Sequence, residues 1–115
     1  MEELVSVLLH SVTNAHILHL QTLSFAKHKA LDDYYNTIGG NVDGLIESYQ
    51  GRYGIIKQYQ SSGPIPTDPV AYFNYLSELV EEYRKFAPQD SYIQNQIDGI
   101  VELIESTRYK LNNLA

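Results

Sequence analysis

Residues 2 to 38 contain neither glycine nor proline, and this uninterrupted stretch constrains the fold more than any other feature of the sequence. Apolar residues recur in it at three- and four-residue steps, which predicts an amphipathic helix. They are Leu4, Val5, Leu8, Leu9, Val12, Ala15, Ile17 and Leu18. A helix of this length is long for a small domain, so we expect a break inside it. Thr22 and Ser24 are the best candidates to cap a new helix there.

The pair Gly39-Gly40 offers a second position for the first turn. Two glycines in the middle of a helix cost roughly 2 kcal/mol relative to alanine. On this alternative, residues 2 to 38 form one helix that folds back on a second helical segment from Asn41 to about Gln60. The residues alone leave both positions open.

The second half of the chain predicts two more helices. Residues 61–66 (Ser-Ser-Gly-Pro-Ile-Pro) form the one clear linker, and Asp68-Pro69 is a strong helix start, with Asp as N-cap and Pro at the first helical position. Pro88 should stop this helix near Phe86, and Asp90 can cap the last helix. The residues expected in the core are Tyr72, Leu76, Leu79, Tyr83 and Phe86, then Ile93, Ile97, Ile100, Ile104, Leu111 and Leu114.

No strand pattern occurs, so we expect a single all-α domain over residues 1–115, built as a bundle of four main helices. Gly99, inside the last helix, could allow close contact with a neighbouring helix. His10 and His19 have no matching partners in the sequence and are expected to face solvent or to be structural. The ten tyrosines lie mostly at helical spacing, which packing explains.

Composition narrows the function. The chain has no cysteine, which excludes disulfides and thiolate metal sites. A formal charge of −6 without a basic tail disfavours nucleic acid as a partner. The apolar runs are too short to span a bilayer, and the start Met1-Glu2-Glu3 lacks the basic region of a secretory signal, so we expect a cytoplasmic protein with no membrane contact.

Four residues suggest a metal site. His28 with Asp32, and Asp43 with Glu47, each stand one helical turn apart, and one continuous helix would place all four within an arc of about 100°. Two copies of this helix, antiparallel about a two-fold axis near Thr37–Ile38, would set His28 opposite the second copy's Glu47 and Asp32 opposite its Asp43. Bound cations would offset the crowded carboxylates, and the mixed oxygen and imidazole set suits iron, and also manganese or zinc.

These residues, together with His16, resemble the ferroxidase motif of the Dps-like mini-ferritins. His16, His28, Asp32, Asp43 and Glu47 match the family's ligand types at every interval, and Phe25, Tyr35 and Gly39 also look like family positions. Ile17 and Ser48 stand where the family usually has Trp and Arg, and Gln21 where it often has Gly.

The resemblance implies a ferritin-like four-helix bundle that forms a two-fold homodimer, and in the family a higher oligomer. It implies Fe2+ binding and oxidation by peroxide or oxygen at the dimer interface, as in iron sequestration and protection from oxidative stress, which would make the chain a ferroxidase. It also favours a first turn near residues 20–24. The connection from Glu47 to Asp68 is too short for the family's extra helix between the second and third helices. The alternative is a non-catalytic helical dimer or interaction protein on the same scaffold.

Overall fold

The computed structural model describes residues 1–115 and contains only helices and connecting segments. In chain order these are α1 (Glu2–Gln21), α2 (Phe25–Tyr53), α3 (Pro69–Tyr83), the short 3-10 helix η1 (Arg84–Phe86) and α4 (Ser91–Asn113). The predicted all-α class with four main helices is therefore confirmed. None of these helices combines the length and the apolar character needed to cross a membrane.

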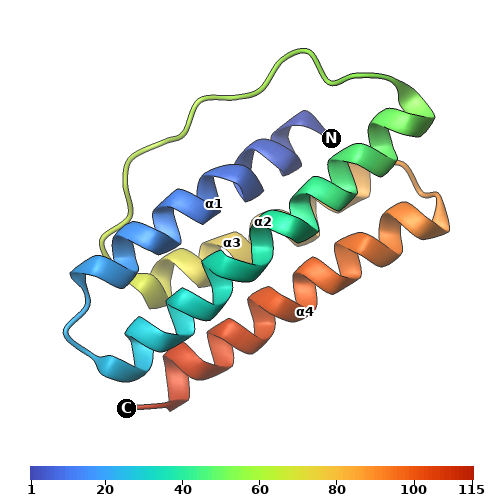
Figure 1. The fold of residues 1–115 in the computed structure, drawn as a ribbon. Coiled ribbons are helices and arrows are strands. Elements are labelled where there is room, and N and C mark those ends of the chain that lie inside the picture. Colours follow the sequence, from blue (N-terminus) through green and yellow to red (C-terminus); the bar gives the residue numbers. More distant parts are fainter.

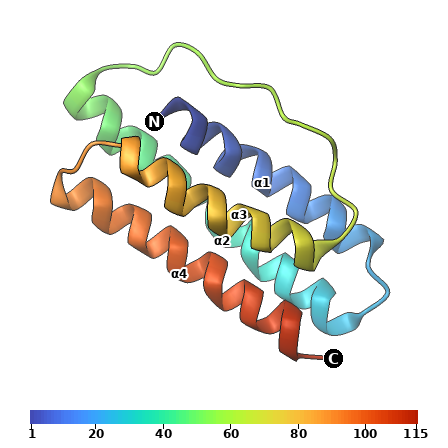
Figure 2. The same cartoon turned by 180° about the vertical axis from the view of Figure 1, so that it is seen from behind.

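The four helices lie side by side, with α2 between α1 and α4, and α3 behind them (Figure 1, Figure 2). Residues 54–68, which we call the strap, carry the chain from the end of α2 back past α1 (Figure 1). Because of this return, α3 begins at the same end of the bundle as α2 and runs in the same direction. The other consecutive helices, α1 with α2 and α3 with α4, are antiparallel.

Twenty-one buried apolar side chains form one core to which all four helices contribute. Tyr34 and Phe73 are the largest of the fully buried side chains, and their rings pack edge to face at 4.8 Å between centroids. The Ser11 hydroxyl donates to the Leu8 carbonyl oxygen at 2.6 Å, so it accepts the hydrogen of the Tyr34 hydroxyl at 2.7 Å. No buried side-chain nitrogen or oxygen lacks a hydrogen-bond partner.

The first turn lies at residues 22–24, and α2 continues through Gly39-Gly40. The Ser24 hydroxyl accepts a hydrogen bond from the Lys27 amide at 3.2 Å, which makes Ser24 the N-cap of α2. The hairpin at Gly39-Gly40 is therefore excluded. Buried Ile38 and Val42 flank the glycine pair, and their packing offsets its low helix propensity.

The second helical segment ends earlier than expected, at Tyr53 rather than near Gln60. Gly54 follows with a φ of +96°, a conformation that costs glycine little and that stops the helix. Ile55 beyond it is 74% exposed, whereas Ile56 is buried and joins the core. The strap holds no additional helix between α2 and α3, in line with the short connection from Glu47 to Asp68.

The start of α3 was predicted correctly, with Asp68 as N-cap accepting from the Val70 amide and Pro69 at the first position. Three packing expectations were wrong. Phe86 is 76% exposed because the chain leaves α3 at Tyr83 through η1 and turns this ring outward. Leu114 is 46% exposed because α4 ends at Asn113. Gly99 faces open space and makes no close helix contact.

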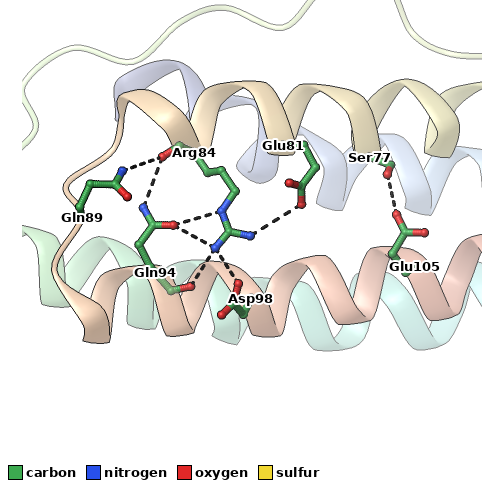
Figure 3. A network of polar contacts seen from close by, with 7 residues as sticks. All are labelled: Ser77, Glu81, Arg84, Gln89, Gln94, Asp98 and Glu105. Carbon is green, nitrogen blue, oxygen red and sulfur yellow. Dashed lines mark hydrogen bonds and ion pairs between the residues drawn. The ribbon is translucent and has the colours of Figure 1, made fainter.

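A polar network holds the α3–α4 hairpin together, and Arg84 lies at its centre (Figure 3). Its guanidinium donates to the Gln94 side-chain oxygen at 2.9 and 3.1 Å and to Asp98 at 2.6 Å. The Gln94 amide in turn donates to the Arg84 and Pro88 carbonyl oxygens. These contacts fix the start of α4. Asp90, at the N-cap position, makes no capping bond and instead accepts a hydrogen bond from the Tyr53 hydroxyl at 2.5 Å.

Candidate functional site

The five predicted metal ligands fall into two groups along the bundle. His16 lies near the end of α1, and His28 and Asp32 lie in the first turns of α2, so these three residues share the end of the bundle where α1 turns into α2. Asp43 and Glu47 lie on the exposed side of α2. At 1.5 Å per residue, Glu47 is about 28 Å from His28 along the helix axis. One chain therefore brings three of the five residues to one region and leaves two apart.

Within one chain, no set of three or more His, Asp or Glu side chains is placed to hold a metal ion. The predicted arrangement takes two carboxylates from a second copy of the chain, so a single chain does not test it. The five-residue ligand set and its iron, manganese or zinc stay a prediction.

His19 and His28 form the best-defined contact at this end of the bundle. His19 Nδ1 lies 2.8 Å from the His28 carbonyl oxygen, and His28 Nδ1 lies 3.0 Å from the His19 carbonyl oxygen. A carbonyl oxygen only accepts, so both Nδ1 atoms carry hydrogen and donate, and in the neutral rings both Nε2 atoms are acceptors. The rings stack with 3.6 Å between centroids. His19 is thus structural, which is one of the two roles expected for it.

Beside this pair, His16 and Tyr35 form a second stack. Their ring centroids are 4.3 Å apart and their planes differ by 12°. The Tyr35 hydroxyl donates to Asp32 Oδ1 at 3.0 Å, and the Asn36 amide donates to the same oxygen at 3.2 Å. The pKa of Tyr35 is raised, first by burial and then by this bond to a carboxylate, so the hydroxyl keeps the hydrogen that it donates. Tyr35 stood out in the sequence only as a family-like position, and its bond to Asp32 was not predicted.

The arrangement favours a structural clamp over chemistry within one chain. The imidazoles stack face to face, and lone pairs in the planes of stacked rings do not converge on one point. Asp32 Oδ1 already accepts two hydrogen bonds. The stacked rings instead join the end of α1 to the start of α2 beside the turn. They belong to His16, His19, His28 and Tyr35.

This clamp supports an exposed apolar surface that sequence analysis missed. Leu20, Leu23 and Phe25, which we call the tip surface, are 70%, 103% and 77% exposed. They stand in and beside a three-residue turn that ends the bundle. The available signal was a run of large apolar residues around the Ser24 cap, outside the helical period of either flanking helix. Exposed apolar side chains that gather at one place mark interaction sites.

The tip surface also has cations beside it. Lys27 and Lys29 lie in the first turns of α2 and take part in no ion pair. Lys110, near the end of α4, is 4.0 Å from Asp33. This end of an otherwise acidic chain therefore combines apolar side chains with unpaired positive charge.

Among known proteins, the chain is similar to an "Uncharacterized 14.6 kDa protein in mobD-ri intergenic region" of Enterobacteria phage T4. The two are 28% identical over 116 residues, which cover 96% of this chain and 87% of the phage protein. No solved structure matches the chain.

The predicted membership of the Dps-like mini-ferritins is wrong, because the family that matches is a different one and the phage relative gives no link to ferritins. Helix geometry accounts for three of the four matching intervals. Steps of 4 and 11 residues return to nearly the same side of a helix, so polar residues along one side of α2 fall on them without common descent. The remaining step, from His16 to His28, crosses the turn between α1 and α2. The family sequence model that matches is described as a "Family of unknown function (DUF5856)" and covers residues 19–111. This match spans most of the sequence, so the chain belongs to the DUF5856 family.

Proposed function

We propose that the chain is a non-catalytic interaction protein of the cytoplasm, which docks through the tip surface on an acidic surface of another protein. The observation that carries the proposal is the exposure of Leu20, Leu23 and Phe25 in one short turn. Large apolar side chains in this position gain free energy only when a partner covers them.

Hydrogen bonds hold the turn that carries these side chains. Ser24 caps α2 through the Lys27 amide, and the Thr22 hydroxyl accepts from the Ser24 amide at 3.2 Å. The stacked His19 and His28 tie the two helices together on either side of the turn. A surface already held in its bound shape loses little conformational entropy on docking, which favours affinity.

Charge selects the kind of partner. The chain carries a net charge of −6, yet Lys27 and Lys29 flank the tip surface without ion-pair partners. A partner surface with an apolar hollow and an acidic rim would complement the tip surface and its two lysines. The same acidic rim would repel the remaining, acidic surface of the chain. Complementary charge of this kind speeds association and fixes orientation.

Site-specific photocrosslinking in the cells that naturally make the protein tests the proposal. A photoreactive phenylalanine derivative at Leu23 should give a discrete protein adduct, whereas the same group at the exposed Glu102 of α4 should not. The adduct should disappear in a Lys27→Glu/Lys29→Glu variant. Adducts that are equal at both positions, or that persist after charge reversal, would exclude the tip surface as a specific docking site.

The connectivity supports a finer statement about architecture. A single long crossover between the second and third helices is the arrangement of ferritin-like bundles, and the strap makes such a crossover. We propose a ferritin-like connectivity as a statement of topology alone, apart from any common descent.

A second candidate function is binding of Fe2+, or of Mn2+ or Zn2+, between two copies of the chain, with oxidation of Fe2+ as its activity. The continuity of α2 through Gly39-Gly40 favours it, because it keeps Asp43 and Glu47 on a helix that also carries His28 and Asp32. His28 Nε2 is available as a ligand because Nδ1 is held by the His19 carbonyl oxygen, the usual support of a metal-bound histidine.

Anaerobic Fe2+ titration of the purified protein, with sedimentation to follow dimer formation, tests this second candidate. The protein should bind Fe2+, and the metal should promote dimer formation. An Asp43→Ala/Glu47→Ala variant should lose both the binding and the metal-dependent dimer. Exposed Glu78 provides the control, as Glu78→Ala should behave as the unaltered chain does. A monomer that ignores Fe2+ would remove this candidate and would leave the docking proposal intact.

A further inference from the structure

A cavity of about 480 Å³ lies beneath the strap, between α1 and α3. Figure 1 shows the strap as a long arch that passes α1 before it reaches α3. Val7, His10 and Asn14 of α1 form one wall, and Tyr72 and Tyr75 of α3 form another. Its volume is in the range of about 300–1,000 Å³ that is usual for small-molecule sites.

The strap is hydrogen-bonded to α1 at Gln60, beside the cavity, whereas the residues that follow are not bonded to the helices. The Gln60 amide donates to the Ser6 hydroxyl at 2.9 Å, and His10 Nε2 donates to the Gln60 carbonyl oxygen at 2.8 Å. Residues 61–67 make no hydrogen bond to the rest of the chain. All seven residues line the cavity, and their backbone groups are not engaged within the chain.

Two side chains offer an unused donor beside an unused acceptor. The Asn14 amide nitrogen donates to the Tyr72 hydroxyl oxygen at 3.2 Å. The Tyr72 hydrogen then has no acceptor in the chain, and Asn14 Oδ1 has no donor. Burial raises the pKa of Tyr72 to about 12, so the hydroxyl keeps this hydrogen at neutral pH. The pair matches a ligand edge that carries an acceptor next to a donor.

The charge of the lining disfavours anions. No Lys or Arg borders the cavity, and Asp68 is its one charged residue. The Tyr75 ring, and Pro64 and Pro66 in the strap, add apolar surfaces beside this hydrogen-bonding pair. Such surfaces suit a planar molecule, and the lone carboxylate disfavours phosphate.

We propose that the strap cavity binds a planar, uncharged nitrogen heterocycle with adjacent donor and acceptor atoms, of the size of a nucleobase or nucleoside. The Asn14–Tyr72 pair hydrogen-bonds to the heterocycle's edge, Tyr75 and the two strap prolines contact its faces, and the unpaired backbone of residues 61–67 closes over it.

Titration of ¹⁵N-labelled protein with adenosine, followed by amide chemical shifts, tests the proposal. Adenosine should shift the resonances of His10, Asn14 and residues 60–68 in a saturable way, and AMP should bind more weakly because its phosphate meets Asp68. Tyr72→Phe should weaken adenosine about fivefold, the usual effect of one lost hydrogen bond. Tyr92→Phe at the start of α4 is the matched control and should bind normally.

Ala71→Leu gives a second test, in which the substitution leaves the packing of the hydrophobic core unchanged. Ala71 is exposed on α3 and borders the cavity, so leucine should fill part of it and abolish binding while the helix stays intact. Shifts that do not saturate, equal binding of AMP and adenosine, or unaltered binding by Ala71→Leu would each overturn the assignment. None of these outcomes bears on the tip surface, which lies on a different part of the bundle.

Discussion

His19 and His28 each place Nδ1 against the other's backbone carbonyl oxygen, at 2.8 and 3.0 Å, with their rings stacked. These two reciprocal hydrogen bonds link the last turn of α1 to the first turn of α2, using the ring and the backbone carbonyl of both histidines. They fix both tautomers, and they hold the turn from the side while the Ser24 cap holds it from within α2.

Replacing His19 by alanine should therefore lower the free energy of unfolding by about 1–3 kcal/mol, because the ring is 8% exposed and the His28 carbonyl loses its donor. His16→Ala is the control, since its ring is exposed and stacks only on Tyr35, and it should cost under about 1 kcal/mol. Urea unfolding followed by circular dichroism measures both. Equal losses would remove the special role of the exchanged bonds.

The stability of the bundle should fall in alkali. Burial raises the pKa of Tyr34 and raises that of Tyr72 to about 12, whereas an unfolded tyrosine ionises near pH 10. The folded state then holds protons that the unfolded state releases, so each residue's contribution is complete below about pH 10 and is lost as the pH rises further. We expect a loss of about 1.4 kcal/mol per pH unit for each such tyrosine.

Tyr34→Phe identifies the source of this decline. The variant should be less stable at neutral pH by about 1 kcal/mol, because Ser11 loses the hydrogen bond it accepts. Between pH 10 and 12 its stability should fall less steeply than that of the unaltered chain. Tyr109→Phe, on an exposed side chain of α4, should keep the full slope, and an unaltered slope in Tyr34→Phe would contradict the assignment.

Much of the fold follows from local patterns. Asp68 and Pro69 start α3 through capping and a fixed φ, which are properties of two adjacent residues. The end of α2 is different. Gly54 stops the helix with its positive φ, and residues 55–60, although compatible with a helix, then place Ile56 in the core and bond Gln60 to Ser6 and His10 of α1. Such contacts are not visible in any local window.

The candidate site was harder to predict for a related reason. The spacing of His16, His28 and Asp32 served to propose a shared metal site, and the three residues do lie at one end of the bundle. It could not reveal that the imidazoles pair with backbone oxygens and with Tyr35, since ring orientation depends on the geometry of the turn. The exposed tip surface was not predicted, because apolar residues near a helix end are equally compatible with a buried position in the core.

Two glycines should respond in opposite ways to alanine. Gly40 lies in the middle of α2 with nothing within 4 Å of an added Cβ, so Gly40→Ala should raise the free energy of unfolding by about 0.5–1 kcal/mol. Gly54 has a φ of +96°, and Gly54→Ala should destabilise by at least about 1 kcal/mol. Thermal melts of the two variants check the signs. A destabilised Gly40→Ala would indicate a helix contact at this position.

The network around Arg84 should matter more than its neighbouring surface ion pair. Arg84→Ala removes the donors to Gln94 and Asp98, and we expect a loss of about 1–3 kcal/mol (Figure 3). Lys85→Ala removes only an exposed pair with Glu82 and should change stability by less than about 0.5 kcal/mol. High salt should leave the difference between the two variants largely intact. If the two losses are equal, Arg84 does not organise the α3–α4 hairpin.

The tip surface should be dispensable for folding, which separates its role from that of the core. Leu23→Ser/Phe25→Ser removes side chains that are 103% and 77% exposed, so the free energy of unfolding should change by less than about 0.5 kcal/mol. Leu31→Ala, at a fully buried position of α2 a few turns away, should cost about 2–5 kcal/mol through lost burial and a cavity. The double variant should also elute earlier than the unaltered chain from a hydrophobic-interaction column, because the apolar area that it lacks is the area presented to the matrix. A large loss of stability in Leu23→Ser/Phe25→Ser would mean that these side chains pack within the chain and are not held outward for a partner.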